Sequence, residues 1–165
     1  MSDKIFLVAG GTGGHLFPAI ATSENDPKNE YIFLIDKRTK KYLQKTKNKY
    51  HVIISEKLQK NPVFLPLMFI KIFFGFLHSI SLIIKYKPKL IVGFGGYTSI
   101  PTILAGKILG KKIIIHEQNA VLGRTNRVLS YISEKVALTF KTTKFATKNS
   151  ILTGIPIRNQ TIKKK

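Results

Sequence analysis

Residues 4–18 read KIFLVAGGTGGHLFP, a short apolar run that passes through four glycines into a segment containing a proline. Six residues rich in branched and aromatic side chains are typical of a buried strand. A glycine-rich loop between a strand and a helix is a setting in which backbone N–H groups and a helix N-terminus bind an anion. The stretch therefore predicts the first strand-loop-helix unit of an α/β fold, with a phosphate as the obvious ligand.

The alternation of strand-like and helix-like segments continues along the chain. Apolar runs predict strands at residues 4–9, 31–35, 51–54, 90–94, 112–116, 136–139 and 150–153. Helices are expected at residues 17–23, 39–49, 63–86, 101–109, 124–133 and 142–146. Pro18 and Pro101 fall near the starts of two of these helices, where a missing N–H is tolerated. The alternation predicts one Rossmann-like α/β domain, a parallel sheet with helices on both faces.

Composition excludes several other classes of protein. The 165 residues contain no cysteine, so disulfides, thiolate zinc sites and a cysteine nucleophile are excluded, and a reducing compartment is expected. An apolar fraction of 44% is too high for a disordered basic tail. The N-terminus lacks the features of a signal peptide, so secretion is not expected. Four histidines without helical pairing favour neither a metal site nor a metal cofactor.

The chain is strongly basic, with 28 Lys+Arg against 8 Asp+Glu and a net charge of +20. Such a surface attracts nucleic acid, an anionic membrane or a phosphorylated substrate, although biased base composition is an alternative origin for part of the lysine excess. No acidic residue lies between Lys57 and His116, and this basic stretch holds the longest apolar run. Basic charge beside apolar surface favours a membrane interface. Nucleic acid is not an expected partner, because no recognised motif is present.

The apolar run at residues 63–84 is long enough to cross a bilayer. Four polar side chains interrupt it along one helical stripe: Lys71, His78, Ser81 and Lys85. A lysine near the centre of a span costs about 2.5–3.5 kcal/mol. A span would also separate strands that belong to one sheet. We therefore expect an amphipathic helix that packs on the sheet and leaves surplus apolar surface for a membrane, with an ordinary buried helix as the alternative.

Three further motifs follow predicted strands. A second glycine loop, GFGGYTS, occupies residues 93–99; HEQN occupies residues 116–119, and GIPIR residues 154–158. Carboxyl ends of parallel strands gather at one sheet edge, where α/β proteins bind ligands. The two glycine loops are therefore expected to face one crevice, although turn formation and loop capping are the simpler alternatives.

Nucleotide-binding fingerprints fit the first glycine loop poorly. Leu16 stands where a dinucleotide fingerprint needs its last small residue, and no Gly-Lys-Ser/Thr follows to make a Walker loop. Asp36 at the end of the second strand is a plausible ribose ligand, so a nicotinamide site stays open as a minor alternative.

Taken together, the motifs resemble those of the MurG family of peptidoglycan glycosyltransferases, in the family's order and spacing. The matching residues are GGTGGHLFP at 10–18, GFGGY at 93–97, HEQN at 116–119 with Gly123 and Asn126, and GIPIR at 154–158. The resemblance implies the N-terminal half of a GT-B fold, with residues 1–158 as the acceptor-binding domain and residues 159–165 as a basic tail or the start of a linker. The family's C-terminal donor domain has no counterpart in the sequence, and its basic glycine loop after the third strand is replaced by residues 55–61.

The resemblance also implies an activity. MurG-type enzymes transfer GlcNAc from UDP-GlcNAc to undecaprenyl-diphosphate-linked lipid I, with inversion and without a bound metal or other cofactor, and so make lipid II for peptidoglycan. They act peripherally at the cytoplasmic face of the bacterial inner membrane. Without a donor domain, this chain is expected to transfer poorly alone. The alternative is a non-catalytic membrane-recruiting subunit that docks a separate UDP-sugar-binding chain.

Roles for individual residues follow from the chemistry and from the resemblance. His15 is the first candidate for the general base, because its ordinary pKa is near neutrality and it follows the glycine loop; Glu117 is the second. A helix-capping function is the alternative for His15. By resemblance, the residues that help to hold UDP-GlcNAc are Thr12, Gly13, Gly14, Asn119 and Arg158. Those that line the acceptor side are Gly95, Gly96 and Tyr97, and Asn126 is a further substrate-binding residue.

Overall fold

The computed structural model describes residues 2–44, 47–56 and 62–158. Seven strands form one sheet in the order β3-β2-β1-β4-β5-β6-β7. They are β1 (Lys4–Ala9), β2 (Glu30–Ile35), β3 (Lys49–Val52), β4 (Leu90–Gly93), β5 (Lys112–Glu117), β6 (Lys135–Leu138) and β7 (Ser150–Leu152). Every neighbouring pair is parallel, which confirms the predicted sheet. The strand order reverses between β1 and β4, the place where open α/β sheets bind ligands.

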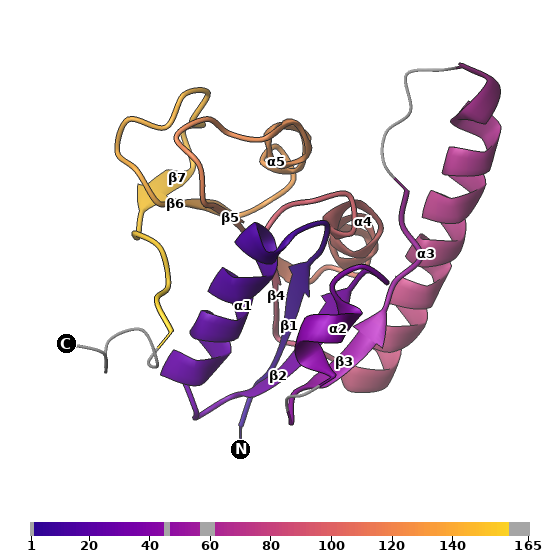
Figure 1. The fold of residues 1–165 in the computed structure, drawn as a ribbon, viewed down its shortest axis with the longest axis horizontal. Coiled ribbons are helices and arrows are strands. Elements are labelled where there is room, and N and C mark those ends of the chain that lie inside the picture. The colour runs from indigo at the N-terminus through magenta and orange to yellow at the C-terminus, as the bar shows by residue number, and fades with distance from the viewer. Residues whose placement is uncertain (1, 45–46, 57–61, 159–165) are drawn as a thin grey trace.

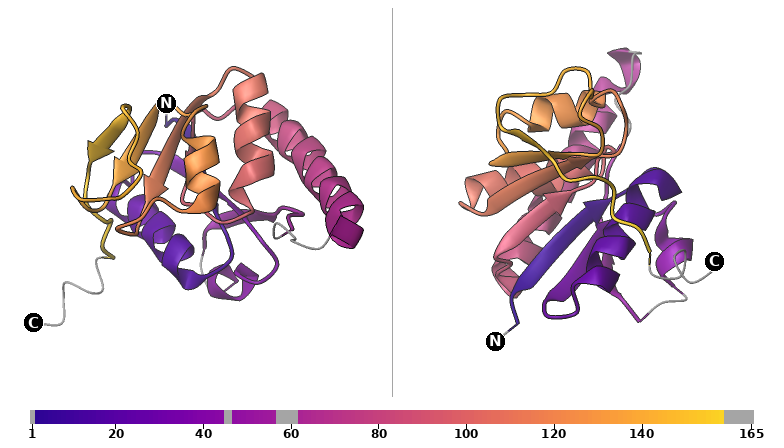
Figure 2. Two further views of the ribbon diagram at one scale, coloured as in Figure 1. Left: turned by 90° about the horizontal axis from the view of Figure 1, so that it is seen from above. Right: turned by 90° about the vertical axis from the view of Figure 1, so that its left-hand side faces the viewer.

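Helices cover both faces of the sheet (Figures 1 and 2). One layer consists of α1 (Gly13–Asn25) and α2 (Lys40–Leu43), and the other of α3 (Leu65–Tyr86), α4 (Ser99–Ile108) and α5 (Arg124–Leu129), with a 3₁₀ turn at Pro62–Phe64. Side chains alternate across β1, so Leu7 enters the core under α1 and Phe6 enters the core under α3 and α4. The predicted Rossmann-like architecture is therefore confirmed.

Helix α1 begins earlier than predicted, at Gly13 instead of residue 17. The two glycines are weak helix formers, but they stand in the same first turn as Leu16, whose full burial against the sheet favours docking of this turn. Pro18 is consequently the sixth helical residue, so its predicted place near the helix start is wrong. Pro101 does lie in the first turn of α4, as predicted.

Three other helices differ from their predicted extents. Helix α2 ends at Leu43, because the following Lys- and Asn-rich residues offer no apolar face and β3 already pairs with β2 from Lys49; residues 45 and 46 lie outside the described residues. Helix α5 ends at Leu129 rather than residue 133. The helix predicted at 142–146 is wrong, because Lys144 pairs with the chain around Val121 in an extended bridge.

Helix α3 is long and apolar enough to cross a membrane, by length and composition alone, and only 28% of its most apolar window is buried. It connects β3 to β4, which lie in one sheet, and it packs beside α4, where the hydroxyls of Ser79 and Thr102 are 2.9 Å apart. One side of the helix is therefore buried in the fold, as predicted, and the fully buried alternative is wrong. The opposite side, called here the α3 apolar face, consists of Leu67, Phe69, Ile70, Phe73, Phe74, Leu77 and Ile84.

After β7 the chain turns back toward α1 (Figure 1). The amide of Asn25 donates to the carbonyl oxygen of Ile157 at 3.0 Å. The guanidinium of Arg158 donates to the carboxylate of Glu24, with Nη2 2.8 Å from Oε1. Two contacts at the end of α1 therefore hold residues 153–158, called here the return segment.

Candidate functional site

The two glycine loops are in backbone contact at the carboxyl edge between β1 and β4. Gly95 and Gly96 both have positive φ, at 94° and 79°. A Cβ atom on Gly96 would lie 2.6 Å from the carbonyl oxygen of Gly10, and one on Gly95 would lie 3.2 Å from Cε1 of His15. These distances are too short or very tight for a side chain. The two glycine loops therefore meet at this edge of the sheet, and the place where they meet is called the crevice here; a ligand site shared by both loops stays a prediction.

Both loops present backbone donors. Thr12 is the N-cap of α1, with extended dihedral angles and no capping hydrogen bond from its side chain. Within the described residues, no acceptor receives the N–H groups of Gly13 and Gly14, and the same holds for Gly95, Gly96 and Tyr97. Free N–H groups at the start of a helix provide positive potential for an anion. The crevice is therefore suited to phosphate groups.

Asp36 stabilises the first glycine loop, because its carboxylate accepts a hydrogen bond from the backbone of that loop. Its carboxylate is 4% exposed and accepts hydrogen bonds from the N–H of Gly11 at 2.8 Å, from the N–H and hydroxyl of Thr39 at 3.0 Å each, and from Arg38. Burial acts to raise the pKa of Asp36, but the Arg38 guanidinium and these N–H groups hold it below its ordinary value. Both carboxylate oxygens are engaged within the fold, so the structure does not support the ribose-ligand alternative.

His15 lies in the first turn of α1, between the two loops. Its Nδ1 atom is 3.0 Å from Oε1 of Gln118, which comes from the loop after β5. Its Nε2 atom has no hydrogen bond to any residue that the structure describes. The imidazole is therefore held at one nitrogen and open at the other.

Glu117 has a different environment. Its carboxylate is 1% exposed. Oε1 accepts from the N–H and the side-chain amide of Asn119, at 3.0 and 2.8 Å, and Oε2 accepts from the N–H of Gly123 and the amide of Asn126, at 2.8 Å each. Four donors shape the loop between β5 and α5 around this side chain. The geometry favours a structural function for Glu117 over proton transfer.

Asn126 carries an unsatisfied polar atom. Its amide nitrogen donates to Glu117, while its Oδ1 is buried without a partner in the described structure. The nitrogen also lies 3.4 Å from the position of a Cβ on Gly95. Oδ1 is therefore a buried free acceptor, and it belongs to an amide group whose nitrogen lies next to the second glycine loop.

Arg158 reaches the first loop through a shared groove. A cavity of about 500 Å³ lies between Gly13, Gly14, Phe17 and Pro18 on α1 and residues 155–158 of the return segment. The guanidinium of Arg158 is paired with the carboxylate of Glu24 in this structure. The groove therefore combines free N–H groups with a guanidinium, and Asn119, in the loop after β5, is exposed.

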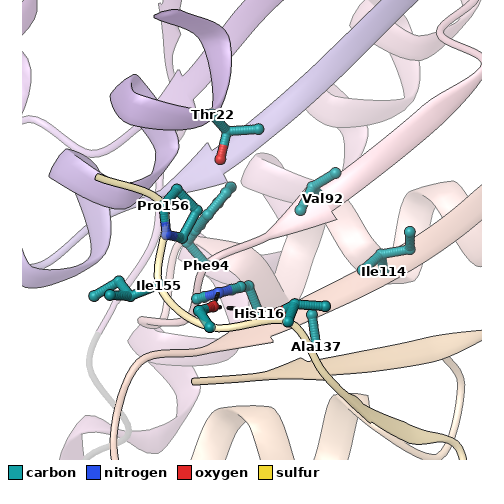
Figure 3. A pocket seen from close by; sticks show the side chains of 10 residues that line it. Thr22, Val92, Phe94, Ile114, His116, Ala137, Ile155 and Pro156 are labelled. Atoms are coloured by element: carbon teal, nitrogen blue, oxygen red, sulfur yellow. Dashed lines mark hydrogen bonds between the residues drawn. The ribbon is translucent and has the colours of Figure 1, made fainter. Parts of the chain in front are cut away.

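A second cavity, of about 290 Å³, lies behind His116 (Figure 3). Val92, Phe94, Ile114 and Ala137 form its sheet side, and Thr22, Ile155 and Pro156 close it. The rings of Phe94 and His116 are 5.5 Å apart, and Nε2 of His116 is 3.0 Å from the carbonyl oxygen of Gly154. Burial lowers the pKa of His116, and the bond to Gly154 and the charge of Glu117 oppose this only partly.

Sequence reasoning assigned no individual role to His116 or Gln118, although both stand in the quoted HEQN motif. The sequence feature that could have identified these two residues is the run of polar side chains directly after an apolar strand. In the described residues, no group of three or more His, Cys, Asp or Glu could hold a metal ion.

Comparison with known proteins gives a consistent result. Residues 5–138 match the glycosyltransferase family 28 N-terminal domain. The chain is 41% identical over 162 residues to the UDP-N-acetylglucosamine--N-acetylmuramyl-(pentapeptide) pyrophosphoryl-undecaprenol N-acetylglucosamine transferase of Rickettsia canadensis, with 94% of this chain and 45% of that protein aligned. It is 40% identical to the protein of the same name from Sinorhizobium fredii, with 93% and 43% aligned.

The crystal structure of Acinetobacter baumannii MurG superposes with a TM-score of 0.80 at 28% identity, over 94% of this chain and 46% of that one. The chain therefore spans less than half the length of each of these three proteins.

Proposed function

Because the chain belongs to glycosyltransferase family 28, we propose that it forms the acceptor-binding half of a MurG-type enzyme. The reaction is the inverting transfer of GlcNAc from UDP-GlcNAc to lipid I, which yields lipid II. The observation that carries the proposal is the crevice between β1 and β4, where two glycine loops present free N–H groups beside His15. Residues 1–158 form this domain.

The proposed chemistry uses one proton transfer. The C4 hydroxyl of the MurNAc residue attacks C1 of GlcNAc, a C–O bond forms, and the bond from C1 to the UDP oxygen breaks. Nε2 of His15 accepts the hydroxyl proton, because it is the nitrogen that remains open beside both loops. Glu117, the second candidate, is assigned to loop structure because four donors already occupy its oxygens.

Binding roles follow from the free donors and acceptors. The N–H groups of Gly95, Gly96 and Tyr97 receive the lipid diphosphate. UDP-GlcNAc is held from this half by Thr12, Gly13, Gly14, Asn119 and Arg158, with Oδ1 of Asn126 accepting a hydrogen bond from a substrate hydroxyl. The relatives are more than twice as long as the aligned part, so a separate or further donor-binding half completes the proposed enzyme.

The α3 apolar face supports a peripheral position on an anionic membrane. Phe69 and Phe73 are 62% and 56% exposed, and neighbouring side chains extend the patch along the helix. Contiguous apolar surface of this kind marks an interaction site. The partner proposed is an anionic bilayer, because the chain carries a net charge of +20 and such a surface attracts acidic headgroups. For a MurG-type enzyme this is the cytoplasmic face of the inner membrane.

A transfer assay tests the enzyme proposal. Labelled UDP-GlcNAc and a lipid I analogue are incubated with the chain alone and with a MurG C-terminal domain added in trans. We expect little transfer by the chain alone and clear transfer with the added domain, which the substitution H15Q abolishes. Folded chain that gives no transfer in either tube would instead favour the non-catalytic recruiting subunit, the second candidate, which the α3 apolar face also supports.

Vesicle sedimentation tests the membrane proposal. The variant F69S/F73S is compared with V128S/Y131S, which removes exposed apolar side chains from α5 and the turn after it. On vesicles with acidic lipids we expect the first variant to lose most of its binding and the second to retain it. Binding of all forms should weaken as salt rises, since screening shortens the reach of the basic charges. Equal losses in both variants would contradict the assignment to α3.

A further inference from the structure

Four groups from three separate segments form a continuous hydrogen-bond chain beneath the crevice. Nε2 of His116 lies 3.0 Å from the carbonyl oxygen of Gly154, and Nδ1 of His116 lies 3.1 Å from Nε2 of Gln118. The other end of that amide, Oε1, lies 3.0 Å from Nδ1 of His15. These hydrogen bonds therefore connect the return segment to the imidazole of His15, which lies between the glycine loops.

The donor and acceptor of each hydrogen bond can be assigned, because a carbonyl oxygen can only accept. The oxygen of Gly154 can only accept, so Nε2 of His116 carries a hydrogen. Nδ1 of the neutral ring is then an acceptor, and it receives the amide N–H of Gln118. Neutrality is consistent with the burial of His116, which is 5% exposed and whose pKa burial lowers.

A second contact determines the orientation of the Gln118 amide. Its nitrogen also lies 3.2 Å from the main-chain oxygen of His116, so both amide hydrogens face acceptors of one residue. The reversed amide would place two oxygens against each other. Oε1 must therefore face His15, and since an amide oxygen only accepts, Nδ1 of His15 carries the hydrogen.

We propose that Gln118, oriented by His116 and Gly154, is a positioning residue that holds His15 as the Nδ1–H tautomer and leaves the Nε2 lone pair open to the crevice. Which nitrogen of a histidine is free is set by the hydrogen bond of the other. After Nε2 accepts a proton, Oε1 of Gln118 still accepts from Nδ1–H, so the same contact also stabilises the imidazolium. The use of this tautomer in catalysis rests on the proposed function, whereas the tautomer itself does not.

Nuclear magnetic resonance of the full chain tests the assignment directly. Long-range proton–nitrogen correlations are recorded on ¹⁵N-labelled protein at about pH 8.5, roughly two units above the ordinary imidazole pKa. We expect His15 to show a protonated Nδ1 and an unprotonated Nε2. His78, whose ring nitrogens make no hydrogen bond to any residue that the structure describes, is the internal reference and should show the Nε2–H form that free neutral imidazoles favour. A majority of Nε2–H at His15 would overturn the proposal.

Two variants separate positioning from mere folding. Q118M keeps the length of the side chain and removes all three of its hydrogen bonds, so His15 should shift to majority Nε2–H. Q118E keeps an acceptor toward His15, so the Nδ1–H form should persist, and this variant decides the question if Q118M fails to fold. An unchanged His15 tautomer in folded Q118M, or its loss in folded Q118E, would overturn the proposal.

Activity provides a separate readout. With the C-terminal domain added in trans, Q118M should lower kcat by roughly 10²-fold or more, within the range that general bases contribute, and leave KM for UDP-GlcNAc near its original value. If no form of the protein transfers GlcNAc, the proposed function fails, while the nitrogen spectra still decide the tautomer.

Discussion

The carbonyl oxygen of Gly10 lies 2.6 Å from the point that a Cβ atom on Gly96 would occupy. Gly10 and Gly96 are 86 positions apart in the sequence, yet the backbones of the two loops meet without room for one methyl group. Gly96 also adopts a φ of 79°, which favours glycine for a second and independent reason. The shape of the crevice therefore depends on both loops together.

The substitution G96A should lower the free energy of unfolding by about 2–4 kcal/mol, because it adds overpacking to the penalty of a left-handed backbone. G110A is the matched control, since Gly110 has a φ of 64° but nothing within 4 Å of its Cβ position. The control should lose only about 1–2 kcal/mol. Denaturant titration measures both, and equal losses would contradict the contact between the loops.

Glu117 offers a test that distinguishes structure from catalysis. In E117Q, whichever way the amide turns, its NH₂ group faces two donors in place of an accepting oxygen. We expect a loss of at least about 2 kcal/mol in the free energy of unfolding, since hydrogen bonds to charged groups are worth about 1.5–3 kcal/mol each. A variant of unchanged stability that had lost transfer would instead return Glu117 to the role of base.

Arg158 should bind anions more tightly when its internal partner is removed. Glu24 holds the guanidinium through Nε and Nη2, so it competes with a ligand phosphate. E24Q should raise the affinity for UDP by roughly twofold to fivefold, the range expected for a partly exposed ion pair of about 0.4–1 kcal/mol. E30Q removes the same charge from a residue paired with Lys49 and should leave the affinity unchanged. Calorimetric titration gives both values.

Two histidines, the buried His116 and the partly buried His51, make stability depend on pH. Burial holds the pKa of His116 below 6.5, and burial together with His78, Lys85 and Lys49 does the same for His51. The unfolded chain therefore binds more protons than the folded chain below about pH 6.5, and stability is lost as pH falls from there.

Each histidine contributes at most about 1.4 kcal/mol per pH unit to this slope. H116Q should flatten the dependence of the unfolding free energy on pH between about 6.5 and 5 without removing the part due to His51. Chemical unfolding at several pH values measures the slopes. A steeper slope in H116Q would reverse the sign that we assign.

Strands were predictable because a parallel sheet buried on both faces requires continuous apolar runs, as in residues 4–9. The ends of the helices were less predictable from the sequence, because tertiary contacts determine where a helix begins and ends. Gly13 and Gly14 are helical beside the buried Leu16, although glycine is a weak helix former, and the bridge at Lys144 takes the place of a helix that the local sequence allows.

At the site, motif positions predicted that the loops would meet. The pairing of His15 with Gln118, 103 residues later, depends on the docking of β5 beside β4 and could not be read from the sequence.

The place of β1 in the sheet has a consequence for how the chain folds. Ile5 pairs on one side with Tyr31 and on the other with Leu90, and none of the seven described strands pairs through a short hairpin. β1 therefore lies inside the sheet, and during synthesis one of its two edges stays unpaired until residue 90 has emerged. Folding should therefore be slow, because non-local contacts close the sheet, and the edge of β1 that waits for β4 is the segment most in need of protection meanwhile.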